Sequence, residues 1–262
     1  MWGYTNAGET AAILFGAARA GLQHDFPSRL EQFRDRTGEV YGRARALAEG
    51  RTLLRYYWPF LPTSEVDAAI AAMAGDSVAH LKFRLGLLTS RFRANHPLKA
   101  CLECMAQDLV EHGWCYWHLE HQYPGVWLCA VHGTLLRSSN MKATGVGRFQ
   151  WNLPDEGTLA LPVERSIGVD LGRVSRLSAT IGSLIARAVT PGVYQLESVR
   201  QTLLEQAALQ SWVTRAGRLR MVPAATDYVD YCRPLKVLQD FAGLPTDHAQ
   251  ACNQLGLIFH PS

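Results

Sequence analysis

The stretch KACLECMAQDLVEHGWCYWHLEHQYPGVWLCAVHGTLL, residues 99–136, decides how this chain folds. It holds four of the six cysteines and four of the nine histidines of a 262-residue sequence. Cys101 and Cys104 form a Cys-x2-Cys pair, and Cys129 and His132 form a Cys-x2-His pair. Each pair can direct two side chains at one metal ion, and three thiolates with one imidazole form a tetrahedral set typical of structural zinc. The spacing therefore predicts a Cys3His zinc finger.

Other interpretations of the same stretch remain open. Cysteines also pack in cores as small apolar residues, but two ligand-only pairs around a short helix at 106–113 favour a metal. A catalytic zinc needs three protein ligands and an open position. The HLE at 118–120 resembles the His-x-Glu motif of zinc deaminases. In those enzymes the Cys-x2-Cys pair follows the His-x-Glu motif, whereas in this chain the cysteine pair comes first. A nucleophile pair of Cys115 with His112 or His118 lacks a third, orienting group.

The remaining cysteines and histidines receive structural interpretations. Cys115 lies among aromatic residues and is expected in the core. Four polar residues are expected to brace the metal pairs as hydrogen-bond partners of the ligands: His118, Glu120, His121 and Gln122. The last two cysteines, Cys232 and Cys252, stand in apolar surroundings, which again predicts core positions.

Composition limits the class of protein. Hydrophobic residues make up 48% and charged residues 19% of the chain, which is typical of a globular protein. The net charge of +3 and the pI near 8.6 permit a nucleic-acid partner without requiring one. No apolar run is long enough to span a bilayer, and the N-terminal residues lack the pattern of a signal peptide. We therefore expect a cytoplasmic protein with no membrane partner.

Glycine and proline divide most of the chain into short amphipathic helices, which predicts a mainly α fold. A helix at 63–75 followed by one at 76–97 has the size of a helix-turn-helix. A wing or turn is expected at 211–223, within a C-terminal helical region that resembles a winged helix. Further helices are expected at 8–22, 27–38, 173–189, 194–209 and 223–243. The predicted organisation is an N-terminal helical region at 1–98, the zinc finger at 99–136, a linker or small β excursion at 137–165, and a C-terminal helical domain at 166–262.

Three groups of basic residues are candidates for DNA binding, because Lys and Arg displace counterions from the phosphate backbone. The first lies on the predicted helix at 76–97, which carries no acid after Asp76. A solvated surface would explain each group as well. The groups are Lys82, Arg84, Arg91 and Arg93; Arg137, Lys142 and Arg148; and Arg215, Arg218 and Arg220.

The pattern of the whole stretch resembles the signature of the TniQ family, in particular its TnsD-like branch. Leu102 departs from it, since proline commonly follows the first cysteine. Weaker similarity extends over residues 3–220. The matching positions are Cys101, Cys104, Asp108, Gly113, Tyr116, Trp117, His121, Gln122, Pro124, Gly125, Val126, Cys129, His132, Gly133 and Leu136.

This resemblance implies a bacterial protein with a role in DNA transposition, acting at the nucleoid. TniQ and TnsD proteins select the target site, either by binding double-stranded DNA or by docking on a CRISPR effector complex, and they recruit the AAA+ regulator TnsC. They are not known as enzymes, and their zinc ligands correspond to Cys101, Cys104, Cys129 and His132. A second copy of the chain is a further candidate partner. Family members usually have an additional N-terminal helix, and long TnsD proteins have further C-terminal DNA-binding helices, so we expect segments to be missing at both ends. The alternative function is a zinc-dependent hydrolase or deaminase acting on nucleosides or nucleic acid.

Overall fold

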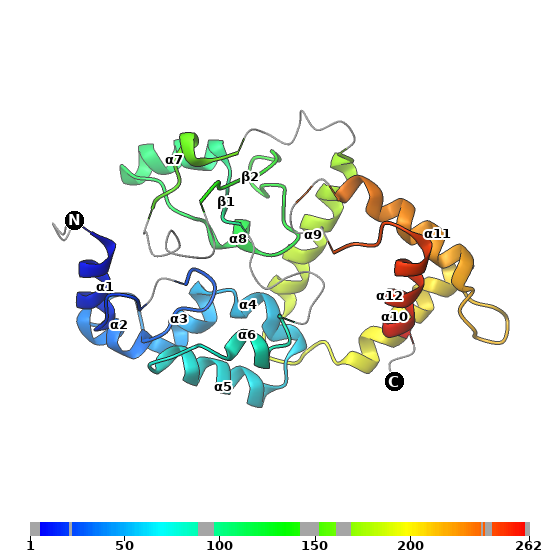
Figure 1. The fold of residues 1–262 in the computed structure, drawn as a ribbon, viewed down its shortest axis with the longest axis horizontal. Coiled ribbons are helices and arrows are strands. Elements are labelled where there is room, and N and C mark those ends of the chain that lie inside the picture. Colours follow the sequence, from blue (N-terminus) through cyan, green and yellow to red (C-terminus); the bar gives the residue numbers. More distant parts are fainter. Residues whose placement is uncertain are drawn as a thin grey trace.

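The chain folds into three groups of elements, which Figure 1 shows from the N-terminal helices to the C-terminal ones. The computed structural model describes residues 6–20, 23–88, 97–141, 152–160, 169–236, 238 and 243–259. We call the groups the N-terminal lobe (described residues up to 88), the Cys/His unit (97–141 with 152–160) and the C-terminal lobe (169–259). The predicted mainly α fold is confirmed.

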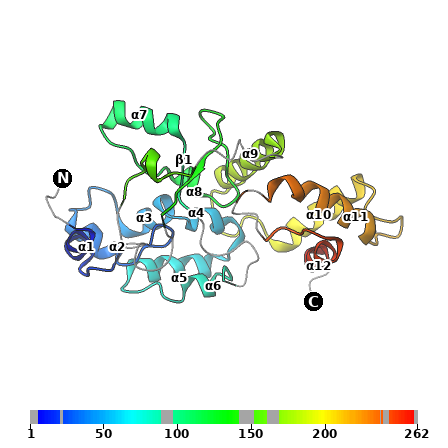
Figure 2. The ribbon, with the colours of Figure 1, turned by 45° about the horizontal axis from the view of Figure 1, so that its top comes forward.

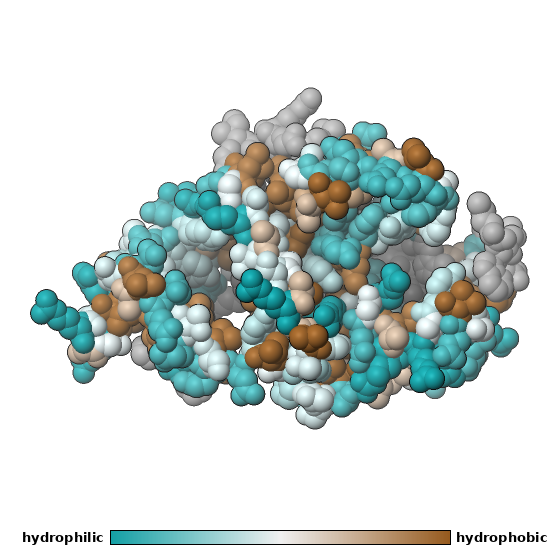
Figure 3. Space-filling view, turned by 180° about the vertical axis from the view of Figure 1, so that it is seen from behind, coloured by the Kyte–Doolittle hydropathy of each residue, from teal (hydrophilic) through white to brown (hydrophobic). Residues whose placement is uncertain are grey.

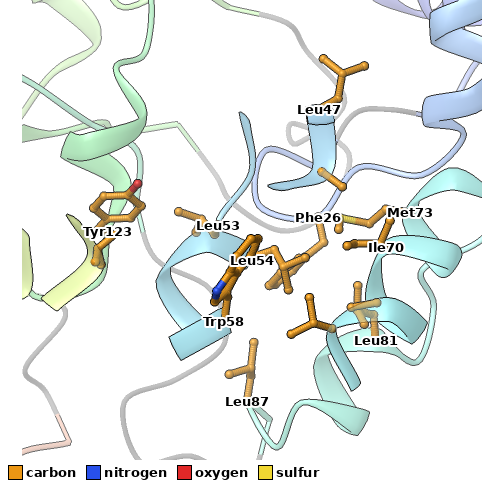
Figure 4. Close-up of a cluster of buried hydrophobic side chains, with 14 of the residues drawn as sticks. Phe26, Leu47, Leu53, Leu54, Trp58, Ile70, Met73, Leu81, Leu87 and Tyr123 are labelled. Carbon is orange, nitrogen blue, oxygen red and sulfur yellow. The ribbon is translucent and has the colours of Figure 1, made fainter. Parts of the chain in front are cut away.

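The N-terminal lobe packs short helices around one apolar core. Its elements are α1 Ala7–Phe15, α2 Leu30–Arg36, α3 Ala44–Arg51, α4 Leu54–Tyr57, the 3-10 helix η1 Trp58–Phe60, α5 Thr63–Ala74 and α6 Leu81–Arg84. Phe26, Leu54 and Met73 are almost completely buried at the centre of this core, which Figure 4 shows. Helix α1 is shorter than predicted, because Gly16 adopts the left-handed conformation (φ 73°) and ends the helix after Phe15.

The predicted helix-turn-helix is only partly present in the described residues. Helix α5 forms as expected and ends at Gly75, although Pro62 rather than Thr63 or Ser64 occupies its N-cap. The second helix, predicted at 76–97, is reduced to α6 in the described part, which is followed by a turn at 85–88. Gly86 adopts a left-handed φ of 69° in that turn, so the backbone leaves the helical path.

The Cys/His unit is built on a small antiparallel sheet. Strand β1 Lys99–Ala100 pairs with β2 Arg137–Ser138, with Lys99 opposite Ser138 and Ala100 opposite Arg137. Helix α7 Leu102–His112 follows β1, as the prediction for 106–113 required, and the short α8 Leu119–Gln122 comes before the second ligand pair. A bridge between Ser139 and Leu159 and the 3-10 helix η3 Glu156–Thr158 extend the unit into the predicted linker, as a small β excursion.

The C-terminal lobe joins the other two groups through its first helix. Its elements are α9 Leu171–Arg187, α10 Leu196–Leu209, α11 Met221–Cys232, the 3-10 helix η5 Arg233–Leu235 and α12 His248–Phe259. Ile185 near the end of α9 packs in the core of the N-terminal lobe, whereas Val174 near its start packs with Trp127 and Cys232. Figures 1 and 2 show α9 between the Cys/His unit and the remaining helices of this lobe. None of the helices within the described ranges is long and apolar enough to cross a membrane.

Candidate metal centre

Four side chains of the Cys/His unit converge on one point. The ligand atoms of Cys101, Cys104, Cys129 and His132 all lie within 4.8 Å of one another. Cys104 Sγ is 3.6 Å from Cys129 Sγ and 3.3 Å from His132 Nδ1, and that nitrogen is 3.6 Å from each of the other two sulfurs. A tetrahedral zinc with bonds of about 2.3 Å to sulfur and 2.0–2.1 Å to nitrogen needs sulfur–sulfur edges of about 3.8 Å and sulfur–nitrogen edges of about 3.6 Å. The arrangement therefore fits a metal ion of this size and ligand preference.

Local backbone structure sets each ligand pair in place. Cys101 occupies the N-cap of α7, and Cys104 follows within the first turn of that helix, so both sulfurs lie at the helix start. The second pair belongs to a tight turn, in which Gly133 donates to the carbonyl of Cys129 at 2.9 Å and Cys129 donates to that of Thr134 at 2.9 Å. Gly133 has a left-handed φ of 67°, which a residue with a side chain rarely adopts.

Polar groups beside the sulfurs form a second layer around the site. Glu103 Oε2 lies 3.0 Å from Cys101 Sγ and also accepts a hydrogen bond from the hydroxyl of Thr134 at 3.0 Å. The pKa of Glu103 is lowered, first by the hydrogen bond from the Cys101 thiol. On the other side, His121 Nε2 lies 3.9 Å from Cys104 Sγ, where the brace role predicted for this histidine would place it.

Burial decides the protonation of the metal-free site. It raises the pKa of the Cys101 and Cys104 thiols above the ordinary value. It also lowers the pKa of His121 to about 4, so this imidazole is neutral at pH 7. A metal ion must therefore displace protons from at least two buried thiols when it binds.

The other predicted members of the stretch lie outside the group of four. His118 Nε2 is 3.0 Å from Asp108 Oδ2, and its ring stacks on Tyr116 with ring centroids 4.3 Å apart. Cys115 is buried and directs its thiol to the carbonyl of Met105 at 3.3 Å, as expected of a core residue. His118 is thus engaged by a carboxylate rather than aimed at the metal position, unlike the histidine that a deaminase-like site would require.

Two further residues hold this unit together, of which sequence reasoning missed Lys99 and predicted a bracing role for Gln122. Lys99 is fully buried, and its ammonium donates to the carbonyls of Tyr123 at 3.1 Å and Val126 at 2.7 Å. Gln122 spans the same segments, because its amide accepts from the Lys99 N–H at 2.9 Å and donates to the Lys99 carbonyl at 2.8 Å. A lysine next to a metal motif is normally interpreted as a surface residue, so only the fold reveals this role.

The first group of predicted DNA-binding residues has local carboxylate partners. Lys82 forms an ion pair with the buried carboxylate of Asp25. Arg84 Nη2 lies 3.1 Å from Glu65 Oε2, and both side chains are about half exposed. These pairs neutralise part of the positive charge that the sequence places on this segment.

The second group is only partly described. Arg137 is buried, and it donates to the carbonyl of Ala160 at 2.7 Å and to Glu156 Oε1 at 3.3 Å. Its guanidinium therefore ties β2 to the segment that follows it in the chain. Arg91, Arg93, Lys142 and Arg148 lie outside the described residues.

Comparison with known proteins places this site in a family. The TniQ family model matches residues 3–136, just over half of the chain, and this range includes all four Cys/His ligands. The transposon Tn7 transposition protein TnsD of Escherichia coli is 28% identical over 85 residues, which cover 32% of this chain. The same match spans only 17% of that protein. By the extent of the family match, this chain belongs to the TniQ family.

Proposed function

We propose that this protein selects target sites in DNA transposition, as an adaptor that binds DNA and recruits a AAA+ regulator of the TnsC kind. The match to the TniQ model across the N-terminal lobe and the Cys/His unit carries this proposal. The similarity to a protein named for transposition supports it. Adjacent genes for a transposase and an AAA+ protein are the expected genomic context, and a neighbouring CRISPR array would favour docking on an effector complex over direct reading of DNA.

The metal in this proposal is a structural Zn2+. Three cysteines and one histidine complete a tetrahedral set, which leaves no position open for a substrate or water. The three sulfurs are buried and belong to the same core cluster as Leu54 and Met73 of the N-terminal lobe. A zinc held this way supplies folding free energy rather than Lewis-acid chemistry. The hydrolase or deaminase alternative would need an open coordination position, which a four-ligand site does not offer.

The DNA-binding element that the structure favours is the hairpin between α10 and α11, which projects from the C-terminal lobe in Figure 1. Val213 pairs with Leu219 across it, and the N–H of Thr214 donates to the carbonyl of Arg218 at 2.8 Å. Trp212 anchors its base, since its indole N–H donates to Asp227 at 2.6 Å.

Three arginines extend from this hairpin. Arg215, Arg218 and Arg220 are all exposed, and among the described residues no carboxylate forms an ion pair with any of them. Unlike Lys82 and Arg84, they keep their charge for an external partner. A hairpin that carries three guanidinium groups without carboxylate partners fits the phosphate backbone of DNA, although the Arg220 guanidinium also donates to the carbonyl of Ser211 at 3.3 Å.

Binding of a labelled DNA duplex at several salt concentrations tests this assignment. The double variant Arg215→Ala, Arg218→Ala should weaken binding and reduce the slope of log K against log salt by about 1–2, because each lost phosphate contact removes about one unit. The matched control is Arg36→Ala, Arg43→Ala, which removes the same charge from exposed positions of the N-terminal lobe. Equal affinity and slope in the two double variants would exclude the hairpin as the DNA contact.

A further inference from the structure

A cavity lies where the three groups of elements meet. Its volume is about 400 Å3, a size suited to one or two side chains of a partner. Exposed apolar residues elsewhere are dispersed, and Figure 3 shows them as separate small patches on one face. The cavity is therefore a candidate recognition feature outside the metal centre. Its lining includes Glu49 and Arg55 from the N-terminal lobe, Trp58 of η1, Glu120 and Tyr123 from the Cys/His unit, and Ile185 of α9.

An unsatisfied donor belongs to this lining. Trp58 is only 7% exposed, and its Nε1 is buried without an acceptor, one of two such side-chain atoms among the described residues. Leaving a buried N–H unpaired costs about 1–3 kcal/mol, so an acceptor atom on a bound group would recover free energy at this position. Figure 4 shows this nitrogen on the edge of the ring that faces away from Phe26, Ile70 and Met73.

A second group of donors lies over the same ring. The guanidinium carbon of Arg55 is 4.8 Å from the centroid of Trp58, and among the described residues no carboxylate pairs with this arginine. Arg55 is partly exposed, so an incoming group can reach it. Because Arg55 covers the ring, a ligand that pairs with the guanidinium is brought to the edge of the indole.

The remaining charges of the lining are unequal in effect. Glu49 Oε1 is held by Arg45 at 3.0 Å, so its charge is largely balanced. Glu120 is exposed at the rim and has no ion pair among the described residues. The pKa of Tyr123 is raised to about 12, mainly by burial and further by the Glu120 carboxylate, whereas Arg55 acts in the opposite direction. Arg55 and Glu120 therefore both lie close enough to influence Tyr123. Arg55 would attract an anion at this position, and Glu120 would repel it.

We propose that this cavity binds an acidic side chain, aspartate or glutamate, presented by a protein partner. The carboxylate would accept hydrogen bonds from the fork of Arg55, which matches its geometry, and from the indole N–H of Trp58. The methylene groups of the side chain would lie against Tyr123 and Ile185. A cationic side chain would meet Arg55, which already occupies the face of the indole. This inference goes beyond the proposed function and does not depend on DNA binding.

The indole N–H resonance of Trp58 in the 15N-labelled full-length chain provides the test, with Trp58→Phe used to assign it. The probes are acetyl-Ala-Glu-Ala-amide and the corresponding peptides with glutamine or lysine in the centre. We expect only the glutamate peptide to shift this resonance saturably, with a dissociation constant on the order of 1–10 mM because one side chain offers few atoms.

Two variants should change the affinity in opposite directions. Arg55→Gln should weaken glutamate binding about tenfold or more, since it removes the charged donor. Glu120→Gln should strengthen it about two- to fivefold, because it removes an exposed like charge. Arg43→Gln, at an exposed position that is not part of the cavity lining, should leave the affinity for glutamate unchanged.

Several results would overturn the proposal. They are an absent shift at 50 mM peptide, an equal shift with the glutamine or lysine peptide, and an Arg55→Gln variant that binds as tightly as the parent. The 15N spectrum of each variant reports whether it is folded. Loss of DNA binding by the hairpin variant would leave this result untouched, so failure of one proposal is distinguishable from failure of the other.

Discussion

Replacing one sulfur ligand should unfold two of the three groups of elements, whereas the same replacement at another buried cysteine should not. Cys129 and Cys232 are each only 1% exposed, so Cys→Ser makes the same chemical change in a comparable environment. Cys129 belongs to the candidate metal group and to the core cluster of the N-terminal lobe. Cys232 belongs to a different cluster, between the Cys/His unit and α11.

The expected magnitudes differ several-fold. Structural zinc contributes about 10 kcal/mol or more of folding free energy, which is comparable to the whole stability of a typical domain, about 5–15 kcal/mol. Cys129→Ser, which breaks the ligand set, should therefore leave the Cys/His unit and the adjoining core unfolded. Cys232→Ser should lower the free energy of unfolding by only about 1–3 kcal/mol, because it buries a hydroxyl where the parent buries a thiol.

Metal content and hydrogen exchange measure the two outcomes. We expect the parent and Cys232→Ser to carry one metal ion per chain and Cys129→Ser to carry none. In Cys129→Ser, peptides from α3, α5 and α7 should exchange rapidly, while α11 and α12, which share a separate cluster around Ala225 and Leu255, should stay protected. The reasoning would be refuted if Cys129→Ser kept its metal, or if it lost the metal while α7 remained protected.

Two further predictions concern the same unit. Lys99→Met should lower the free energy of unfolding by about 1–3 kcal/mol, because it removes the donor to the buried Val126 carbonyl and leaves the Tyr123 carbonyl with only the N–H of Val126. Urea denaturation measures this loss, and Lys236→Met, at a partly exposed lysine, should change stability by less than about 0.5 kcal/mol. Metal binding should release at least two protons, since burial raises the pKa of Cys101 and Cys104 in the metal-free protein and keeps both thiols protonated at neutral pH. The apparent affinity for the metal should therefore rise with pH, because fewer protons then compete for the thiolates. Calorimetry in two buffers with different ionisation enthalpies counts the protons released. Release of fewer than two would contradict the assignment.

The ligand group could be predicted from the sequence because its geometry is local. Cys101 and Cys104 are joined by one helical turn, and Cys129 and His132 by one tight turn, so each pair is fixed by its own few residues. Only the approach of the two pairs depends on the rest of the fold. Their shared composition was enough to predict that approach, since one metal ion satisfies both pairs.

The charged residues could not be placed in the same way. Lys82, Arg84 and Arg137 look alike in sequence as parts of basic groups, yet all three form ion pairs with carboxylates at least 19 positions away, and Arg137 is also buried. Lys99, which has no neighbouring acid, is the most buried of the four. Side-chain charge alone does not tell a surface contact from an internal tie, because the partner comes from a distant element.

The Cys/His unit shares its hydrophobic core with the N-terminal lobe, so it is not an independent zinc finger. A free-standing zinc finger has its own small core, but here Cys101, Cys104 and Cys129 pack in the same cluster as residues of α3, α4 and α5. Ile185 of α9 closes that cluster from the C-terminal lobe, and it also lines the cavity that we assign to an acidic partner. A metal ion that fixes the cysteines therefore fixes the position of Trp58 and Arg55 as well. On both proposals, metal loss should abolish recognition at the cavity although no metal ligand lines it, because its effect would pass through the shared core.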